Sequence, residues 1–226
     1  MWLYAFIPAA VATAGAVYTV LRPPSDKTVG AVQHFAAGVI FYAAAGELLP
    51  DATRHGLIWP IIAGGAVGIL AMLLLRHGAE KVRGPAGLAG ASAIDALIDG
   101  LVLGLGFMAG QHQGVLLAIA LAIEFLFLGL SLAAAFGQGS SRWLVIGTTA
   151  GIALMVPLGA LIAKPIGALP ASYRTAAFAF GLIALLYLVT EELLVEAHEK
   201  PETAWGAALF FVGFLALTVL DQLLDK

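Results

Sequence analysis

Two aspartates, one helical turn apart, stand in an otherwise apolar stretch, S-A-I-D-A-L-I-D-G-L-V-L-G (residues 92–104). If this stretch is helical, Asp95 and Asp99 lie on the same face, so both carboxylates point in the same direction. An ionised acid at the centre of a bilayer costs about 2.5–3.5 kcal/mol even on lenient insertion scales. The pair is therefore expected to face a polar partner, a cavity or a metal ion.

A third acid, Glu124, follows in the next apolar stretch, L-A-I-A-L-A-I-E-F. The short connection G-Q-H-Q-G (110–114) predicts that the two helices are antiparallel neighbours with their acids at similar depth. Three converging carboxylates would form an oxygen-rich site of the type that hard or borderline divalent cations prefer. A protonated, hydrogen-bonded interhelical pair is the alternative. Close approach of the two helices is favoured by small residues around the acids, namely Ala93, Ala96, Gly100, Ala120 and Ala122.

The composition is that of a membrane protein. Of the 226 residues, 61% are hydrophobic and only 11% are charged, and the mean hydropathy is +0.98, far above the average for soluble domains. The chain has no cysteine, which excludes a disulfide framework, a thiolate metal site and a cysteine nucleophile. The net charge of −3 comes without basic runs, so neither nucleic acid nor an anionic membrane surface is expected as a partner.

Eight apolar runs are each long enough to cross about 30 Å of hydrocarbon. They predict one transmembrane domain, residues 1–226, with an all-α fold, because backbone groups in lipid must be satisfied within helices or a closed barrel and the alternation of a barrel is lacking. The predicted helices cover residues 2–21, 32–50, 57–76, 88–109, 114–136, 143–164, 175–196 and 203–224.

Basic residues are distributed unevenly between alternate connections of these helices. By the positive-inside rule the richer side is cytoplasmic, and with an even number of spans both termini are then extracytoplasmic, in a membrane of the bacterial cytoplasmic type. The richer side carries Arg22, Lys27, Arg76, Lys81, Arg83, Arg142 and Lys200, and the other side carries Arg54, Lys164, Arg174 and Lys226.

The second and seventh predicted helices resemble one another. Residues 34–52 read H-F-A-A-G-V-I-F-Y-A-A-A-G-E-L-L-P-D-A, and residues 177–198 read A-F-A-F-G-L-I-A-L-L-Y-L-V-T-E-E-L-L-V-E-A-H. The two helices cross in opposite directions, so the likeness fits an inverted repeat in which helices 1–3 match helices 6–8 around helices 4 and 5. The alternative is that E-L-L at a helix end is common in any leucine-rich protein.

Ionisable residues within the predicted spans are almost all acidic. Because no lysine or arginine is expected at their depth, protonation, polar helix partners or a bound cation must neutralise them. The expected route of a transported ion is lined by acids near helix ends and by polar groups closer to solvent, where solvated interfacial residues are the alternative. The in-span set is His34, Glu47, Asp95, Asp99, Glu124, Glu191 and Glu192, and the expected route comprises Glu47, Glu191, Glu192, Ser92, His112, Asp51 and His55.

These motifs resemble those of the ZIP (Zrt/Irt-like protein) family of divalent-metal transporters over nearly the whole chain. The likeness rests on eight spans, A-G-V-x(7)-E-L-L-P in the second helix, L-Y-L-V-T-E-E-L-x-x-E-A-H in the seventh and an acid–glycine pair in the fourth. Aligning the family's H-N-x-P-E-G on Asp99–Gly100 puts Asp95 at the position of a ligand histidine, and Glu124 falls at a histidine of the fifth helix.

The resemblance implies a metal centre in helices 4 and 5 but only one of the family's two sites. Ala96, Phe125 and Val156 stand where the second site needs ligands, so a second adjacent metal is not expected. Replacing imidazole by carboxylate shifts the expected preference from zinc toward harder ions. Zinc, manganese, iron(II) and cadmium all remain candidates as the substrate, and no organic cofactor is expected.

The resulting hypothesis is a secondary transporter that moves a divalent cation toward the cytoplasm, with Asp95, Asp99 and Glu124 as ligands. The rivals are a ZIP-fold scaffold or sensor without transport, and a proton-coupled transporter of another solute. An enzyme is not expected, because no H-E-x-x-H, G-x-S-x-G or P-loop motif occurs. The sequence leaves open whether the chain forms a homodimer.

Overall fold

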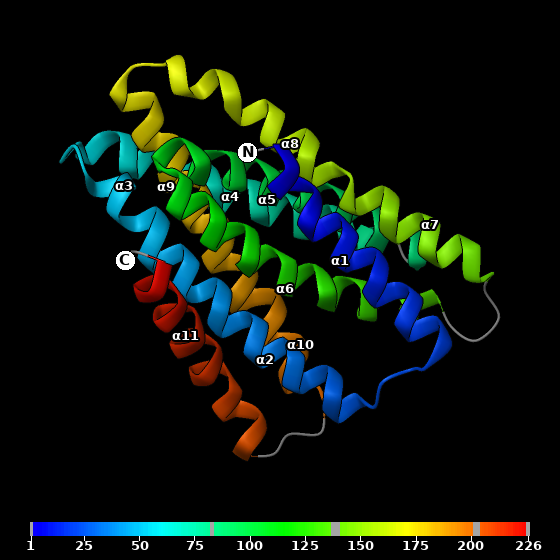
Figure 1. Ribbon diagram of the computed structural model, residues 1–226. Helices are drawn as coiled ribbons and strands as arrows, with labels where there is room; N and C mark the ends of the chain where they lie inside the picture. Colours follow the sequence, from blue (N-terminus) through cyan, green and yellow to red (C-terminus); the bar gives the residue numbers. More distant parts are fainter. Residues whose placement is uncertain (1, 82–83, 137–140, 201–203, 225–226) are drawn as a thin grey trace.

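The computed structural model describes residues 2–81, 84–136, 141–200 and 204–224. In these ranges all regular structure is helical and no strand is present. Eight helical runs of the described residues are long and apolar enough to cross a membrane, which confirms the predicted all-α membrane fold (Figure 1). The N- and C-terminal residues of the described chain lie toward the same end, here called the terminal end, with the turn at Gly110.

Five of the eight runs are continuous α-helices and three are interrupted. The continuous ones are α1 (Trp2–Leu21), α4 (Ile58–Lys81), α5 (Pro85–Ala109), α6 (Gln111–Phe136) and α11 (Ala204–Leu224). The second run is α2 (Asp26–Tyr42), the π-helix η1 (Ala43–Leu48) and α3 (Leu49–Thr53). The sixth is α7 (Arg142–Ala153), α8 (Met155–Ala163) and the 3₁₀-helix η2 (Lys164–Ala168), and the seventh is α9 (Ala171–Tyr187), the π-helix η3 (Leu188–Leu193) and α10 (Leu194–His198).

Several predicted boundaries were wrong where local capping extends a helix. The second run starts at Asp26 instead of residue 32, because the Ser25 hydroxyl accepts a hydrogen bond from the Thr28 backbone N–H at 3.2 Å and caps the helix. The fourth connection is reduced to Gly110, so His112 lies on α6 and not in a turn. The interruption of the sixth run at Leu154 is explained by Pro157, which has no N–H to donate to the carbonyl of Ala153.

The surface of the bundle is suited to lipid. Large apolar side chains of α4 and α11 are exposed along most of each helix, as expected for helices that face hydrocarbon. Trp59, Trp143 and Trp205, each near the start of its helix, are 79%, 82% and 85% exposed. Tryptophan at helix ends is typical of the membrane interface, where the ring contacts lipid and the indole N–H contacts water.

The helices pack as two groups. The first helix group consists of α1, α5, α6, α7 and α8, in which α1 packs along α6 and α5 packs along α8. The second helix group consists of α2, α4, α9 and α11 with the short segments continuous with α2 and α9, and here α11 packs along α2 and α4 along α9. The two groups meet where α2 contacts α6, and where α5 contacts α4 and α9.

The contacts made by the first three runs are repeated by the last three. The pair α1 with α6 corresponds to α8 with α5, and the pair α11 with α2 corresponds to α4 with α9. Glycines mark close approaches in both sets of contacts. Gly213 faces the Phe35 carbonyl as Gly68 faces the Phe180 carbonyl, and Gly129 faces the Ala12 carbonyl as Gly100 faces the Val156 carbonyl. The helices α2 and α9 run in opposite directions (Figure 1).

A π-helix directly follows α2 and another directly follows α9. Placing η1 on η3 residue for residue, without a gap, puts Tyr42 on Tyr187, Glu47 on Glu192 and Asp51 on Glu196. A π-helix inserts an extra residue into a helical turn and is frequent at functional sites. Here it rotates the acids that follow it relative to the rest of the helix.

Candidate metal-binding site

Two neighbouring helices bring the three predicted acids together. Asp95 and Asp99 project from one face of α5, and Glu124 projects from α6, which runs antiparallel to α5 after the break at Gly110. One carboxylate oxygen from each acid lies within 4.8 Å of those of the other two. The predicted convergence at one depth is therefore confirmed, and the cluster is called the carboxylate triad below.

The triad is buried, and its hydrogen-bonding capacity is only partly used. Asp99 is 2% exposed and Glu124 5% exposed, while Asp95 is partly exposed. Asp99 Oδ2 and Glu124 Oε2 are both buried without a hydrogen-bond partner. A buried oxygen that has given up its hydrogen bonds to water without gaining a partner in the protein is unfavourable in free energy. Each of these oxygens therefore has the capacity to accept a bond from a proton or a cation.

The two helices that carry the triad pack closely against other helices of the first group. A Cβ at Gly100, next to Asp99, would overlap the backbone of Val156 in α8, and a Cβ at Gly129 would overlap the backbone of Ala12 in α1. Only a residue without a side chain lets the backbones approach this closely. The helices that carry the acids are therefore packed closely against α8 and α1 of the first helix group.

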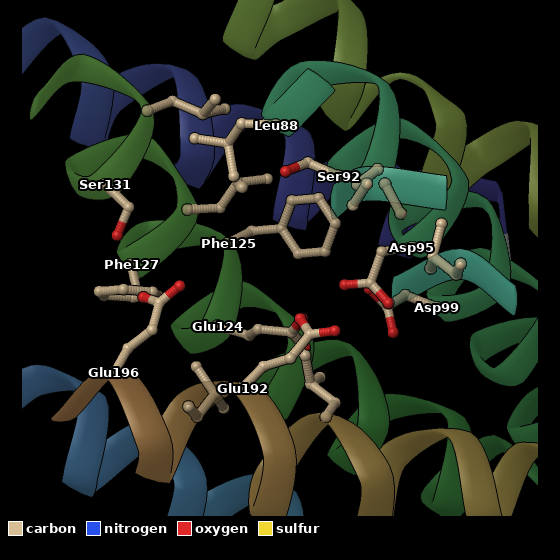
Figure 2. Close-up of a pocket in the computed structure, with 18 of the residues that line it drawn as sticks. Leu88, Ser92, Asp95, Asp99, Glu124, Phe125, Phe127, Ser131, Glu192 and Glu196 are labelled. Atoms are coloured by element: carbon tan, nitrogen blue, oxygen red, sulfur yellow. The ribbon is translucent and has the colours of Figure 1, made fainter. Parts of the chain in front are cut away.

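A cavity of about 270 Å³ reaches from the triad toward the end opposite the termini. Figure 2 shows Asp95, Asp99 and Glu124 at its inner wall, with Glu192 extending toward them from the seventh run. Ser92, Glu191 and Glu192 were predicted to line a route, and they line this cavity. It is also lined by Ser131 of α6 and Glu196 of α10.

Three residues that the sequence comparison singled out have side chains that cannot bind a metal. Ala96 and Phe125 are 1% exposed and Val156 is fully buried. Figure 2 shows the Phe125 ring beside Ser92, on the side of the triad that faces the cavity. The grouping of three ligand-capable residues found among the described residues is the triad itself.

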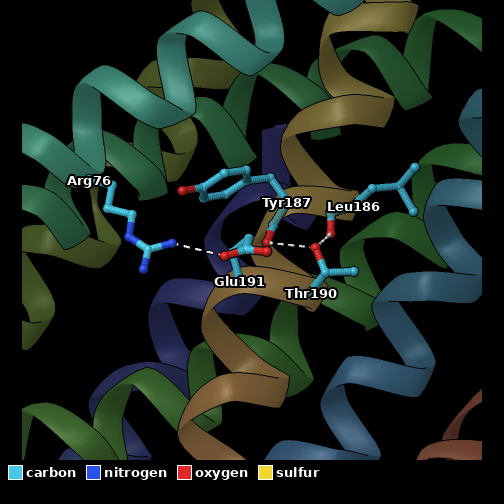
Figure 3. Close-up of polar contacts among 5 residues, drawn as sticks. All are labelled: Arg76, Leu186, Tyr187, Thr190 and Glu191. Carbon is cyan, nitrogen blue, oxygen red and sulfur yellow. Dashed lines mark hydrogen bonds and ion pairs between the residues drawn. The ribbon is translucent and has the colours of Figure 1, made fainter.

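One acid of the cavity has a basic partner that the sequence interpretation excluded. Arg76 Nη1 donates to Glu191 Oε2 at 2.8 Å, and both side chains are about half exposed. Figure 3 shows this pair with Tyr187 beside it and with the Thr190 hydroxyl bonded back to the Leu186 carbonyl. The prediction that no arginine lies at the depth of these acids was wrong for Glu191, because α4 continues past Arg76 to Lys81, so that Arg76 lies inside the helix and not at its end.

Two further residues of the predicted route lie at the terminal end, away from the cavity. His112 Nε2 donates to Asp221 Oδ1 at 2.5 Å, and the Tyr42 hydroxyl donates to Asp221 Oδ2 at 2.5 Å. Glu47, which is 5% exposed, lies on the η1 segment that follows Tyr42. Glu47 was expected near interfacial water but is buried, because η1 packs against α6 and α9.

Asp51 and His55 line a separate cavity of about 390 Å³ at the terminal end. Arg54 and Arg174 line it as well, and Arg54 Nη1 lies 3.7 Å from Asp51 Oδ1. Two guanidinium groups in one cavity repel a divalent cation. Asp51 and His55 therefore belong to a different cavity from the triad and do not line the cavity that reaches it.

Sequence reasoning missed four residues around these sites: Tyr42, Arg76, Glu196 and Asp221. Asp221 lies within the predicted eighth span, three residues from its end, and an acid at such a position could have indicated a polar contact with a neighbouring helix. Glu196 accepts a hydrogen bond from Gln33 Nε2 at 2.9 Å and faces the cavity, although its place near a helix end indicated a solvated residue.

The arrangement can bind a cation through oxygen atoms alone. Three carboxylates in a partly enclosed, low-dielectric site attract a divalent ion strongly, and without one they must share protons. No protein-family model matches this chain, and no curated protein is significantly similar to it.

Proposed function

We propose that this protein is a secondary transporter of a divalent metal cation, which it binds through Asp95, Asp99 and Glu124. The observation that carries the proposal is the convergence of three carboxylate oxygens within 4.8 Å at the inner wall of a cavity, with two buried oxygens lacking partners. Lipid-facing helices surround the site. A buried acid cluster that communicates with one end of a membrane bundle is typical of an ion pathway.

The proposed direction of transport is toward the cytoplasm. The cavity opens at the end where α1, α4 and α6 finish, which is the end with more lysine and arginine in its connections. The positive-inside rule assigns that end to the cytoplasm. The structure would then represent a state that is open to the cytoplasm.

Alternating access would arise by movement of the first helix group relative to the second. The repeated contacts of the first and last three runs, with opposite directions of α2 and α9, support an inverted repeat. In inverted-repeat transporters the two conformations are related by exchanging the roles of the repeats. This arrangement also supports the proposal that the chain belongs to the ZIP family, whose motifs its sequence resembles.

The proposal is tested with purified protein in liposomes. Uptake of Mn²⁺, reported by quenching of an enclosed dye, is expected for the wild type and should fall at least tenfold in the double variant Asp95→Asn, Glu124→Gln. Ser131→Ala, which changes the same cavity without touching the triad, is the matched control and should keep most of the uptake.

The rival functions have distinct outcomes. Mn²⁺ binding without uptake in the wild type would indicate a sensor or scaffold. Absence of both binding and uptake for Mn²⁺, Zn²⁺ and Cd²⁺ would contradict the proposal and leave a proton-coupled transporter of another solute.

A further inference from the structure

At the terminal end of the bundle, a polar cluster of Asp221, Tyr42 and His112 joins the two helix groups. Asp221 belongs to α11 of the second group and accepts hydrogen bonds from Tyr42 of α2, in the same group, and from His112 of α6, in the first group. The His112 and Asp221 side chains are only 25% and 19% exposed. Charge-assisted hydrogen bonds of this kind are stronger than neutral ones, more so away from water.

Polar contacts at the cavity end have a different arrangement. The pairs Arg76–Glu191, Gln33–Glu196 and Lys200–Asp26 each join residues that belong to, or directly follow, helices of the second group. Among the described residues, these three contacts stay within one group at the end where the cavity lies, whereas the His112 contact joins both groups at the terminal end.

The internal repeat relates these two ends. The register that places Tyr42 on Tyr187 also places Asp221 of α11 on Arg76 of α4. Figure 3 shows Tyr187 beside Arg76, as Tyr42 lies beside Asp221. Tyr42 and Asp221 therefore have counterparts at the cavity end, where Arg76 donates a hydrogen bond to Glu191 of the second group.

The path from the cluster to the triad runs along α6. His112 and Glu124 are separated by about 18 Å at 1.5 Å per residue. Leu116 and Ala120 lie between them on the same face of α6, and they are 0% and 1% exposed. This stretch is buried in the present conformation, so an ion reaches the triad from the terminal end only after the two groups separate there.

We propose that His112, Asp221 and Tyr42 form the gate of the terminal end, and that the hydrogen bond between His112 and Asp221 must break before the triad is exposed there. Tyr42 orients Asp221 from within its own group. The inference rests on the proposed alternating access. It identifies the residues that keep the terminal end closed in this conformation.

The test uses thiol accessibility, which requires no metal. Because the chain has no cysteine, Ala120→Cys is a unique reporter beneath the gate and Ser131→Cys is a unique reporter in the cavity. Each is reacted in detergent solution with a charged methanethiosulfonate reagent, and rates are compared with and without His112→Ala or Asp221→Ala. The matched control is Asp51→Ala, which removes an acid of the same end that is paired with Arg54 within one segment.

The thiol at position 120 is expected to react at least about tenfold faster in His112→Ala and in Asp221→Ala, corresponding to about 1.4 kcal/mol. The thiol at position 131 should react no faster, and Asp51→Ala should leave both rates unchanged. Unchanged reactivity at position 120 in both gate variants would overturn the proposal, as would a parallel rise at position 131, which indicates general loosening. A gate confirmed in a protein that moves no metal would show that only the transport proposal had failed.

Discussion

Replacing Asp99 by asparagine should stabilise the ion-free protein while it weakens ion binding. Asparagine has the shape of aspartate but carries no charge, so it removes the repulsion between position 99 and the other two acids. For two charges at 4.8 Å, the upper limit of the oxygen–oxygen distances in the triad, Coulomb's law with an effective dielectric constant of 20 gives about 3.5 kcal/mol for each ionised pair. Since shared protons relieve part of this repulsion, a gain of about 1–3 kcal/mol is expected.

The gain should appear as a higher melting temperature in EDTA at pH 8. For a chain of this length, 1 kcal/mol corresponds to about 2–4 °C, so Asp99→Asn should melt about 2–12 °C above the wild type. The difference should shrink on acidification to pH 5, because protons then neutralise the acids of the wild type and relieve the same repulsion. Mn²⁺ at millimolar concentration should raise the melting temperature of the wild type and have much less effect on the variant.

Asp51→Asn is the control for this measurement. Asp51 lies 3.7 Å from Arg54, so its neutralisation removes an attraction and should not stabilise the protein. The reasoning would be refuted if Asp99→Asn melted at or below the wild-type temperature in EDTA at pH 8. It would also be refuted if Mn²⁺ stabilised the variant as strongly as the wild type.

Two further predictions concern packing and metal preference. Gly129→Ala should lower stability by about 2 kcal/mol or more, because its Cβ would overlap the backbone of Ala12; Gly147→Ala, where no atom lies within 4 Å of the added Cβ, should be neutral or stabilising by up to about 1 kcal/mol. Equal effects of the two substitutions on thermal unfolding would contradict this account. Asp95→His should raise the affinity for Zn²⁺ relative to Mn²⁺, because imidazole is a softer ligand than carboxylate. A competition titration measures this ratio, and an unchanged ratio would argue against Asp95 as a ligand.

The fold was predictable because lipid imposes a simple rule on the chain. Apolar runs of about 20 residues must be helices in a bilayer, and all eight predicted runs correspond to helices of the described residues. Helix ends were predicted less well, because they depend on local events such as the cap at Ser25. The shortness of the G-Q-H-Q-G connection was enough to predict that α5 and α6 are neighbours.

The triad was predictable from the spacing of its residues along helices that the lipid rule predicts. Asp95 and Asp99 share a helix face by their spacing, and Glu124 follows at a similar distance from the turn. The cluster at Asp221 was not predictable in this way, because Tyr42, His112 and Asp221 belong to three helices far apart in the sequence. Their contact depends on how α11 packs along α2 and reaches α6.

The sequence by itself determined which segments are helical and that three acids lie at one depth, since both follow from residue spacing and the cost of charge in lipid. Only the tertiary structure decided which acids face the triad, that Arg76 is held by Glu191, and which end of the bundle is closed. These features arise from contacts between helices that are distant along the chain, and the π-helices η1 and η3 turn the acids beside them in directions that regular helical spacing does not predict. Asp95 and Asp99 were found from their spacing alone, whereas their cavity and its closed end depend on the packing of the two helix groups.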